Sequence, residues 1–434
     1  MSAKSRAIGA LVNTYLTSRP AKHAVYDVGR MLRGGRRRAR LYYRADDPYS
    51  HLLAQVAPRL KAAYGITVEI IPVAPPGLAA NPAPEMLRDH AIRDAAILAE
   101  RHGLSFPADA THPPDDRVRR AHAVLLEPRP ADEQVSIAIE LGEAVWRQDG
   151  RALADIVERH GGISGESVRP ALAANYQALE RAGHYQPGML QYGGEWYWGV
   201  DRLCHLEARL HREGVEGSLD LLTDPSPLLA SAVPLPCEKP LQIELFFSFR
   251  SPYSYVALPQ LIALRDRHGI AVRVRPVLPM VMRGLEVPRS KRLYIALDTK
   301  READRLGVPF GHVCDPLGKG IGYCMALFFR CIEGSGDELD RLSSIAKGIW
   351  AEARDVAHLP DLIHLADRAG ISEADVRAAI EDRAWEEKAR ANRDALTALG
   401  LWGVPSLRIG GYATWGQDRI AALEGEIARV SAAV

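Results

Sequence analysis

Apolar and polar positions alternate in a stretch near the middle of the chain. Between Ile243 and Phe247 every second residue is apolar, and Gln242 and Glu244 are polar residues of the same alternation. A period of two is typical of a β-strand, because successive side chains of a strand point to opposite faces of the sheet. Residues 241–249 are therefore predicted to form a strand.

The residues after this strand predict the start of a helix. Ser251 suits the N-cap, because its hydroxyl can accept a hydrogen bond from a helix N–H that has no other partner. Pro252 suits the first helical position, where its missing N–H costs nothing. The helix is expected to extend to about Arg267. Its positive end would stabilise an anion such as a thiolate, although an ordinary capped helix is the simpler interpretation.

The remaining pattern of the second half predicts more helices and then a hairpin. Gly410-Gly411 is a turn between two short apolar segments, and Gln417-Asp418 starts the last helix. The predicted elements are a strand near 270–277, an amphipathic helix over 291–306, helices around 338–355, 360–369 and 373–396, and hairpin strands over 407–409 and 412–415. The helical segments lie in an insert over about 280–398.

The first half of the chain repeats this plan. Asp47-Pro48-Tyr49-Ser50 matches Ser251-Pro252-Tyr253-Ser254 at an offset of 204, and 17 of the 60 positions from 47 to 106 are identical at that offset. Near the end of each half a proline, Pro187 or Pro405, precedes a Gly-Gly turn and a Trp-Gly-x-Asp-Arg segment. Each half therefore reads as strand, helix, strand, helical insert, hairpin and terminal helix, with the insert of the first half over about 78–182.

The length of 434 residues suggests two or three domains. We predict a basic helical arm over 1–38, a first domain over 39–212, a proline-rich linker over 213–240 and a second domain over 241–434. A β-α-β unit requires a right-handed parallel crossover, and the hairpin adds antiparallel strands, so each sheet should be mixed.

Charge gives little indication of a polyanionic partner. The formal net charge is +1, and no apolar segment approaches the length of a membrane span. We therefore expect no nucleic acid and no membrane partner. The first 40 residues differ, since they contain a single acid, Asp27, and ten bases, namely Lys4, Arg6, Arg19, Lys22, Arg30, Arg33, Arg36, Arg37, Arg38 and Arg40. This arm could bind a polyanion, or it could be a solvated helical segment that packs on the body.

The five cysteines form no Cys-x-x-Cys pair, and neither they nor the histidines have metal-ligand spacing. No metal is therefore predicted. The odd number and wide spacing of the cysteines also argue against a disulfide framework. A reducing, cytoplasmic location is expected.

The second half resembles the DsbA-like branch of the thioredoxin superfamily. Within that branch it is most similar to 2-hydroxychromene-2-carboxylate isomerases and kappa-class glutathione transferases. The resemblance is carried by five segments, namely 247–255 (FSFRSPYSY), 288–294 (PRSKRLY), 307–310 (GVPF), 403–405 (GVP) and 415–419 (WGQDR). The first half resembles the same family more faintly. The fold class expected is α/β, with two tandem thioredoxin-like (DsbA-like) domains, each a mixed sheet with a large helical insertion.

This resemblance implies glutathione as thiol cofactor or co-substrate. Thiol oxidoreductases of the fold have Cys-x-x-Cys where this chain has Ser251-Pro252-Tyr253-Ser254, so disulfide exchange has no nucleophile here. In kappa-type enzymes a serine at the first of these positions donates a hydrogen bond to the glutathione thiolate. Together with the helix N-terminus, that bond would lower the pKa of the thiol. Ser251 is the catalytic residue that the resemblance implies.

The same resemblance implies the residues that hold glutathione. Pro405 would follow a cis peptide bond and, with Val404, would present backbone groups to the tripeptide. Gln417 and Asp418 would hold the γ-glutamyl end, where a carboxylate suits the ammonium group. Lys291 matches a family lysine near the thiol or an acidic substrate. The alternative interpretations are that Pro405 is an ordinary turn proline, that Asp418 is an ordinary acid at a helix N-terminus, and that Lys291 is a solvated lysine on a helix face.

Three departures from the family put the reaction in doubt. The asparagine that the family has ahead of the lysine is absent from 280–287. Arg250 adds a cation that could lower a thiol pKa or bind an acidic substrate. In the first half, Asp47 replaces Ser251, and an ionised carboxylate cannot donate a hydrogen bond and repels a thiolate. The first half is interpreted as a degenerate copy, against the alternative that Asp47 and His51 form a second acid–base site.

The function predicted is a glutathione-dependent isomerase or transferase that acts on a small unsaturated or aromatic electrophile. A non-catalytic thioredoxin-fold binding or scaffold protein is the alternative, and a DsbA-family oxidoreductase in name, without Cys-x-x-Cys, comes third. The predicted partners are a small-molecule substrate and the other half of the chain, which would pack as a pseudo-dimer. Further homo-oligomerisation is left open.

Overall fold

The computed structural model describes Thr14 and residues 18–32, 34–221 and 242–432. These residues divide into two compact units. The first-half unit contains residues 20–221 and Pro288–Tyr294, and the second-half unit contains residues 242–287 and 295–432. Most of the predicted linker over 213–240 lies outside the described residues, as do Cys237 and much of the predicted arm.

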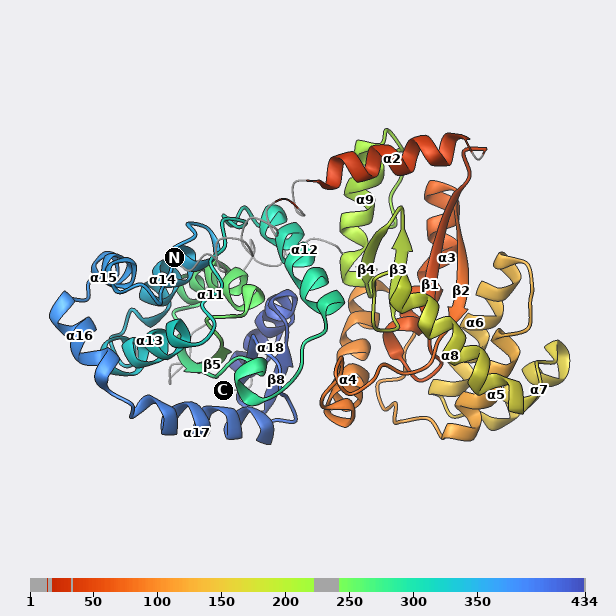
Figure 1. The fold of residues 1–434 in the computed structure, drawn as a ribbon. Coiled ribbons are helices and arrows are strands. Elements are labelled where there is room, and N and C mark those ends of the chain that lie inside the picture. Colours follow the sequence, from red (N-terminus) through yellow and green to blue (C-terminus); the bar gives the residue numbers. More distant parts are fainter. Residues whose placement is uncertain (1–13, 15–17, 33, 222–241, 433–434) are drawn as a thin grey trace. The chain divides into compact units, whose positions relative to one another are not determined.

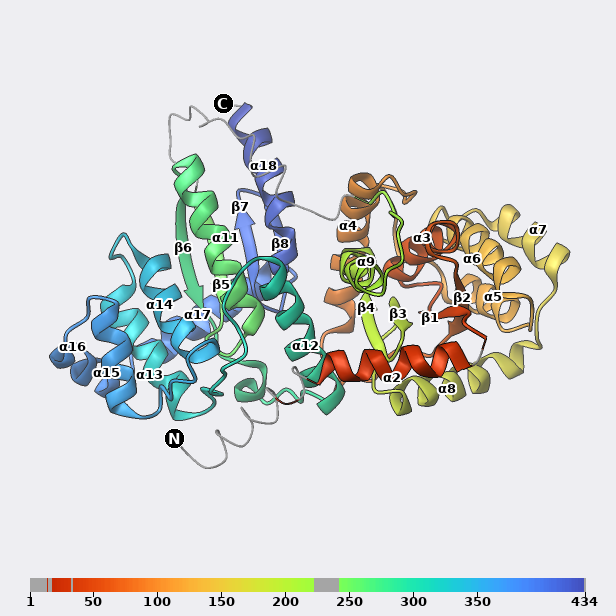
Figure 2. The ribbon, with the colours of Figure 1, turned by 90° about the horizontal axis from the view of Figure 1, so that it is seen from above.

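The second-half unit is built on a mixed four-stranded sheet of order β6-β5-β7-β8 (Figure 2). β5 is parallel to β6 and antiparallel to β7, and β8 completes the hairpin with β7. The elements of this framework are β5 (Gln242–Phe247), α11 (Pro252–His268), β6 (Ala271–Pro276), β7 (Ser406–Ile409), β8 (Tyr412–Trp415), η4 (Gln417–Arg419) and α18 (Ile420–Ala432). The predicted strand-helix-strand unit and the hairpin are confirmed.

The insert between β6 and β7 is helical, as predicted. Its elements are η2 (Met280–Arg283), α12 (Arg289–Arg305), α13 (Lys319–Leu327), the π-helical η3 (Phe328–Ile332), α14 (Glu338–Trp350), α15 (Leu359–Arg368), α16 (Glu373–Glu381) and α17 (Trp385–Ala398). The single helix predicted over 373–396 is wrong. Asp382 has extended backbone, and its carboxylate accepts a hydrogen bond from Ala384 N at 2.8 Å, which ends α16 before α17 begins.

The first-half unit has the same plan, with a mixed sheet of order β2-β1-β3-β4 (Figure 1). Its elements are α2 (Arg19–Leu32), β1 (Arg37–Tyr43), α3 (Pro48–Tyr64), β2 (Ile66–Pro72), α4 (Pro84–His102), α5 (Asp115–Leu125), α6 (Ala131–Trp146), α7 (Gly150–His160), α8 (Gly165–Arg181), β3 (Met189–Tyr192), β4 (Glu195–Trp198), η1 (Val200–Arg202) and α9 (Leu203–Arg212). The helix predicted in the basic arm is α2.

The two sheets pair their strands in the same register. Equivalent strand pairs are Arg38–Thr67 and Gln242–Ala271, Ala39–Tyr192 and Ile243–Ile409, and Met189–Trp198 and Ser406–Trp415. The offset is 204 before the insert and 217 after it. The equivalence of Pro187 with Pro405 is wrong by one residue. Gly188 O accepts from Gly199 N at 3.0 Å, as Pro405 O accepts from Gly416 N at 3.0 Å, so Gly188 stands at the Pro405 position.

Alternation along the central strand places one large and one small apolar core on opposite faces of each sheet. Leu41 and Tyr43 of β1 pack in the large core with α3 and α6, whereas Tyr42 packs in a small aromatic core with Trp196. Phe247 of β5 lies in the large core with α11 and α14, whereas Phe246 packs with α17. Each central strand is therefore covered on both faces, which holds its carboxyl end in place.

Among the described helices, none is long and apolar enough to cross a membrane.

Candidate functional site

Ser251 lies where β5 ends and α11 begins. Its backbone is extended, with φ −99° and ψ 111°, and its Oγ accepts a hydrogen bond from Ser254 N at 3.1 Å. The predicted N-cap is therefore confirmed. The same hydroxyl donates to Val404 O at 3.3 Å. Ser251 thus joins the positive end of α11 to the loop before β7, at the carboxyl edge of the sheet.

The loop before β7 contains the described residues' one cis peptide bond, between Val404 and Pro405, as predicted. Gly403 is required here, because a Cβ at this position would lie 2.1 Å from a ring carbon of Trp415 on β8. Ser406 Oγ donates to Gly403 O at 2.9 Å. The Trp415 ring and this hydrogen bond hold Val404 and Pro405 against the N-terminus of α11.

Gln417 is almost completely buried, and both ends of its side-chain amide have partners. Its Oε1 accepts from Gln260 Nε2 of α11 at 3.3 Å, and its Nε2 donates to Glu302 Oε2 of α12 at 2.9 Å. Gln417 therefore connects α11, α12 and η4. Because the side chain is almost completely buried, a ligand carboxylate would have little access to this amide.

Asp418 is more accessible than Gln417, with 17 % of its side chain exposed. Its Oδ1 lies 3.4 Å from Arg419 Nη1. Gly416 has φ 124°, and a Cβ there would lie 2.3 Å from the same oxygen. Gly416 therefore leaves space in which the Asp418 carboxylate sits at the start of the 3₁₀ turn that leads into α18.

A network of buried charges on α12 is the feature that sequence reasoning missed. Asp298 accepts from Tyr253 OH at 2.9 Å and from Arg301 Nη2 at 2.8 Å. One turn further, Glu302 accepts from Gln417 and from Arg305 Nη2 at 2.9 Å. These bonds fix the first turn of α11 and the Gln417 amide to the same helix. The identity of Asp94 and Asp298 in the repeat was the available signal.

Arg250 has a different position from the one suggested for a cation that acts on a thiol. Its Nε and Nη2 each donate to the carboxylate of Asp315, both at 2.7 Å. A bidentate pair of this kind compensates most of the guanidinium charge. The structure therefore gives Arg250 a structural partner in the long insert.

Lys291 belongs to the first-half unit, in the segment Pro288–Tyr294. Its Nζ donates to Ala80 O at 2.8 Å and lies 5.9 Å from the centre of the Tyr185 ring. Burial lowers the pKa of its ammonium group to about 8. Ser251 is brought against the Val404–Pro405 loop, and Gln417 and Asp418 lie in the same unit on η4, which follows β8. Lys291 belongs to the other unit.

The described cysteines all carry free thiols, and they are Cys204, Cys314, Cys324 and Cys331. Burial raises the pKa of Cys314 to about 11 and that of Cys324 further. A raised pKa leaves these two sulfurs as thiols at neutral pH, and such thiols are poor nucleophiles for disulfide exchange.

In the first-half unit, Asp47 caps α3 as Ser251 caps α11. Its Oδ2 accepts from Ser50 N at 2.9 Å and from Ser50 Oγ at 2.5 Å. Burial raises the pKa of this carboxyl to about 6, against the lowering effect of the two Ser50 bonds. The carboxylate has only acceptor atoms when ionised, so it cannot replace the hydroxyl of Ser251 as a donor.

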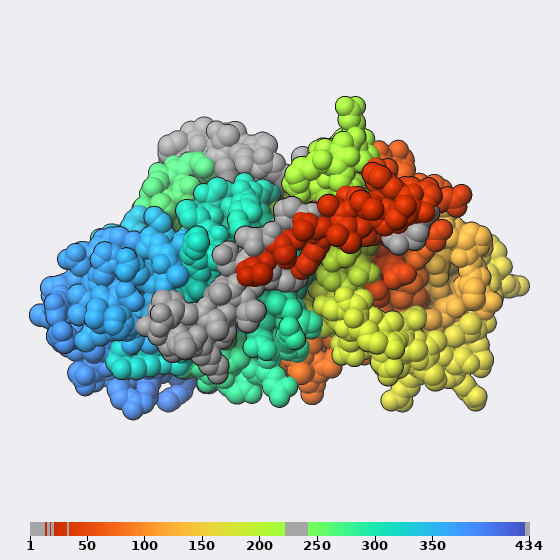
Figure 3. All heavy atoms as spheres, turned by 45° about the horizontal axis from the view of Figure 1, so that its top comes forward, coloured from red at the N-terminus to blue at the C-terminus, as the bar shows by residue number. Residues whose placement is uncertain are grey.

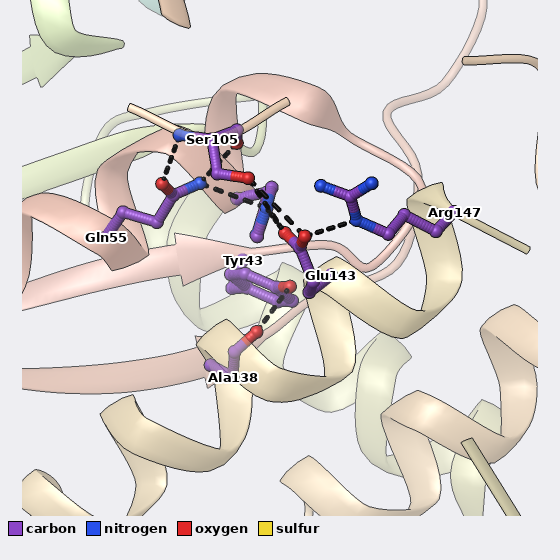
Figure 4. A network of polar contacts seen from close by, with 7 residues as sticks. Tyr43, Gln55, Ser105, Ala138, Glu143 and Arg147 are labelled. Carbon is purple, nitrogen blue, oxygen red and sulfur yellow. Dashed lines mark hydrogen bonds and ion pairs between the residues drawn. The ribbon is translucent and has the colours of Figure 1, made fainter. Parts of the chain in front are cut away.

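The Asp47–His51 acid–base pair is not formed, because the two side chains have different partners. His51 is fully buried, and its Nε2 lies 3.0 Å from Gln55 Nε2 and 3.9 Å from Glu143 Oε2. Glu143 of α6 also accepts from Ser105 Oγ and pairs with Arg147, which follows the end of α6 (Figure 4). Burial lowers the pKa of His51 to about 4. His51 therefore belongs to a network that joins α3 to α6.

The second-half site can bind and orient an anion. It offers a hydroxyl at a helix N-terminus, the backbone of the Val404–Pro405 loop, and a partly exposed carboxylate at Asp418. The hydroxyl and the helix dipole both stabilise negative charge, and the carboxylate suits an ammonium group. A zwitterionic thiol would satisfy all three features.

Comparisons with known proteins match part of the chain. Residues 242–428 match the family described as the DSBA-like thioredoxin domain. A 2-hydroxychromene-2-carboxylate isomerase of Pseudomonas putida is 22% identical over 198 residues, which is 43% of this chain and 95% of that protein.

Two of the solved structures that match part of the chain are the following. A 2-hydroxychromene-2-carboxylate isomerase structure is 20% identical and covers 44% of this chain and 96% of its own, with a TM-score of 0.38. The cytosolic disulfide reductase DsbM of Pseudomonas aeruginosa is 18% identical and covers 44% of this chain and 100% of its own, with a TM-score of 0.34.

Proposed function

We propose that this chain is a glutathione-dependent isomerase or transferase, and the match of residues 242–428 to the DSBA-like thioredoxin domain supports this. Its substrate would be a small unsaturated or aromatic electrophile, and the similarity of part of the chain to a 2-hydroxychromene-2-carboxylate isomerase supports this. The observation that carries the proposal is the position of the Ser251 hydroxyl. It lies at the N-terminus of α11 and within hydrogen-bonding distance of the Val404–Pro405 loop.

The hydroxyl of Ser251 would activate the thiol of bound glutathione. Its present bond to Val404 O, at 3.3 Å, is longer than the 2.7–2.8 Å typical of O–H···O bonds. Exchanging that weak acceptor for a thiolate therefore costs little. A hydrogen bond to a charged group contributes about 1.5–3 kcal/mol, which lowers a thiol pKa by roughly 1–2 units.

The remaining residues would position the cofactor. Val404 and Pro405 would hold the tripeptide backbone, and Asp418 would bind the ammonium of the γ-glutamyl end. Gln417 would act through Asp418 and η4, since its own amide is bonded to Gln260 and Glu302. In the isomerase reaction the thiolate adds to a conjugated system, rotation follows about the bond that has become single, and the thiolate leaves as the double bond re-forms.

Calorimetric titration of glutathione into the purified protein tests this proposal. One site per chain is expected, with affinity reduced about tenfold in Asp418→Ala because a charge-assisted bond is lost. The matched control is Asp201→Ala, which removes the equivalent carboxylate of the first half and should leave binding unchanged. The pKa of the bound thiol, read from thiolate absorbance, should rise by about 1–2 units in Ser251→Ala.

Binding that is absent from the wild type would overturn the glutathione proposal. Two sites per chain, or equal losses in the Asp418 and Asp201 variants, would contradict the assignment to the second half. Ser251→Ala also removes a helix cap, which is typically worth about 1 kcal/mol. Ser251→Thr keeps both the cap and the hydroxyl, so it should retain the low thiol pKa if the hydroxyl is responsible.

A non-catalytic binding protein is the second candidate, and the burial of Gln417 favours it. A side chain with both amide ends bonded inside the protein offers nothing to a ligand. In that case glutathione would bind, if at all, with an unshifted thiol pKa. Thiol titration in the bound state therefore separates the two candidates.

A further inference from the structure

The amphipathic helix α2 is turned the opposite way from an ordinary surface helix. Its apolar residues point away from the body of the first-half unit, and Val25, Val28, Met31 and Leu32 are 58–83% exposed. Ala21 and Ala24 are also exposed and lie on the same face, because these positions recur at intervals of three and four residues. We call this face, formed by Ala21, Ala24, Val25, Val28, Met31 and Leu32, the outer stripe.

The opposite face of α2 binds the body through polar and aromatic contacts. Tyr26 packs edge-on against Tyr192 of β3, with 5.6 Å between ring centres, and the Arg209 guanidinium lies 5.5 Å from the Tyr26 ring. His23 Nε2 lies 3.1 Å from Glu195 Oε1 of β4. In Figure 1 α2 lies across β3, β4 and α9, and in Figure 3 it forms a ridge on the surface. These contacts fix the rotation of α2, so the outer stripe is held outward.

A stripe of this kind requires an occupant, because a helix normally buries its apolar face. Charge identifies the occupant. Lys22 of α2 and Arg36, four residues after the helix, are exposed, and the first 40 residues contain ten bases and one acid. Arg30 pairs with Asp27, and Arg38 and Arg40 pair with Glu69. The exposed Lys22 and Arg36 are therefore the bases that indicate a negatively charged partner. A partner must therefore accept apolar side chains and carry negative charge on the same surface.

We propose that α2 docks the protein on an anionic phospholipid bilayer. The outer stripe would enter the headgroup–acyl boundary, and the flanking bases would contact lipid phosphates. With 14 residues α2 is about 21 Å long, shorter than the roughly 30 Å hydrocarbon core, so it would lie on the membrane and not cross it. The overall net charge of +1, which indicated no membrane partner, hides this local concentration of bases.

Other occupants fit the charge less well. A second copy of α2 would bring the same cations to a two-fold interface, where like charges repel. Nucleic acid would satisfy the bases but would leave the apolar stripe in water. The residues before α2 add Lys4 and Arg6 and no acid, so they are also poorly matched in charge.

Vesicle co-sedimentation tests the proposal directly. The full chain is expected to bind vesicles of equal parts phosphatidylglycerol and phosphatidylcholine, and not vesicles of phosphatidylcholine alone. Val28→Asp should weaken binding at least tenfold, and Lys22→Gln with Arg36→Gln should weaken it about 25-fold, since each base contributes about fivefold. The matched controls are Leu78→Asp, at an apolar residue that is 70% exposed elsewhere in the unit, and Arg383→Gln in the second half.

Salt dependence and surface protection give independent readouts. Raising salt from about 0.1 M to about 1 M shortens the Debye length from about 10 Å to about 3 Å and should release most of the protein. A cysteine introduced as Val28→Cys should react with a water-soluble thiol reagent in buffer and become protected on anionic vesicles. Leu78→Cys should remain reactive in both conditions.

Three results would overturn the proposal. One is equal binding of the wild type and the Val28→Asp variant to anionic vesicles, which would mean purely electrostatic adsorption. Another is a Val28→Cys thiol that is already protected in buffer while the protein is a monomer, since the chain itself would then cover the stripe. The third is a dimer that dissociates in Val28→Asp without any vesicle binding, since a second copy would then be the occupant.

Discussion

The N-cap of α3 in the first-half unit is Asp47, and the N-cap of α11 in the second-half unit is Ser251. Both side chains accept the backbone N–H three residues later, at 2.9 and 3.1 Å respectively. Asp47 offers only acceptor atoms when ionised, whereas Ser251 also has a proton to donate. The helix cap is thus preserved in both halves, while a hydroxyl that can donate a hydrogen bond is present at the cap of only one.

The loop that faces the cap changes together with it. Gly188 N donates to Ser50 Oγ at 3.1 Å, and Ser50 Oγ in turn bonds Asp47. Pro405 occupies the Gly188 position and has no N–H, and the equivalent hydroxyl of Ser254 has no hydrogen-bond partner among the described residues. In the first half these polar groups satisfy one another, and in the second half they leave the cap available.

The equivalent helices α4 and α12 make one contact that is the same in both halves and one that differs. Tyr49 OH bonds Asp94 at 2.8 Å, and Tyr253 OH bonds Asp298 at 2.9 Å in the equivalent position. By contrast, the equivalents of the bonded pair Gln417 and Glu302 are Val200 and Leu98, which both lie in the large apolar core. The tyrosine–aspartate bond is therefore common to both halves. The polar pair Gln417 and Glu302 of the second half is replaced by two apolar residues in the first.

The largest expected effect comes from giving the second half the cap of the first. Ser251→Asp keeps the helix cap but places an acceptor where a thiolate should lie. The lost donor and the added repulsion should raise the pKa of bound thiol by at least about 2 units, and the thiolate fraction at neutral pH should fall roughly 100-fold. Turnover of a conjugated electrophile in the presence of glutathione measures the loss.

The reverse exchange, Asp47→Ser, is the matched control for this prediction. It should leave turnover unchanged, because Ser50 and Gly188 still occupy the surroundings of that cap. A loss of activity in Asp47→Ser equal to that in Ser251→Asp would place the chemistry in the wrong half. Unchanged activity in both variants would show that neither cap acts on a thiol.

Removal of the Ser50 hydroxyl should lower the free energy of unfolding more than removal of the equivalent Ser254 hydroxyl. Ser50→Ala removes a bond to a buried carboxylate and leaves Arg44 N without its acceptor, so it should destabilise by about 2–4 kcal/mol. Gly188 N keeps its bond to Tyr42 O at 2.9 Å. Ser254→Ala removes a hydroxyl without a partner and should lie within about 0.5 kcal/mol of wild type. The midpoint of urea unfolding measures the change in stability for each of the two variants. Equal losses would mean that an unseen partner satisfies Ser254.

Transplanting the apolar pair into the second half should reveal coupling. Gln417→Val leaves Glu302 buried with one partner fewer, and Glu302→Leu removes the acceptor of Gln417 Nε2, so each should destabilise by about 1–3 kcal/mol. The double variant copies Val200 and Leu98 and should lose less than the sum, by about 1–2 kcal/mol. Strict additivity in urea unfolding would show that the pair is not exchanged as a unit.

Sequence reasoning recovered what local chemistry determines. The alternation around Leu245, the Ser251-Pro252 cap and the Gly410-Gly411 turn each act within a few residues, so the strands, the helix start and the hairpin could be predicted. The Gln417–Glu302 bond joins positions 115 residues apart, and the bidentate Arg250–Asp315 pair joins positions 65 apart. No periodicity records such contacts, because only the folded chain brings the partners together.

The same limit applies to two assignments that were made from residue identity. Lys291 was assigned to glutathione by resemblance, and the segment around it packs against Ala80 and Tyr185, so its role at the glutathione site stays a prediction. Pro187 was matched to Pro405 by residue type, whereas strand pairing places Gly188 there. For the proline, the backbone register decides the equivalence.

The smallest expected effect is a pH dependence confined to the first half. Burial lowers the pKa of His51 and of His122 to about 4, so between about pH 6.5 and 4 the unfolded chain binds more protons and stability falls as pH falls. Each histidine should lose about 1 kcal/mol between pH 6.5 and 5.5, as His51→Gln and His122→Gln would show by flattening the profile.

Asp47 acts in the opposite direction and makes the sign testable. Its folded pKa of about 6 lies above the unfolded value, so the folded state gains protons first and stability from this group rises as pH falls through 6. Asp47→Asn should therefore make the free energy of unfolding fall more steeply as pH falls, whereas the histidine variants should make it fall less steeply. Hydrogen exchange resolved by peptide measures the two halves separately. The protein is equilibrated in urea at each pH, the exchange pulse is given at one fixed pH, and the unfolded fraction is read from peptides of β1 and of β5. In the second half Ser251 and Tyr255 replace Asp47 and His51, and neither titrates in this range, so equal acid sensitivity of β1 and β5 would contradict the assignment to these groups.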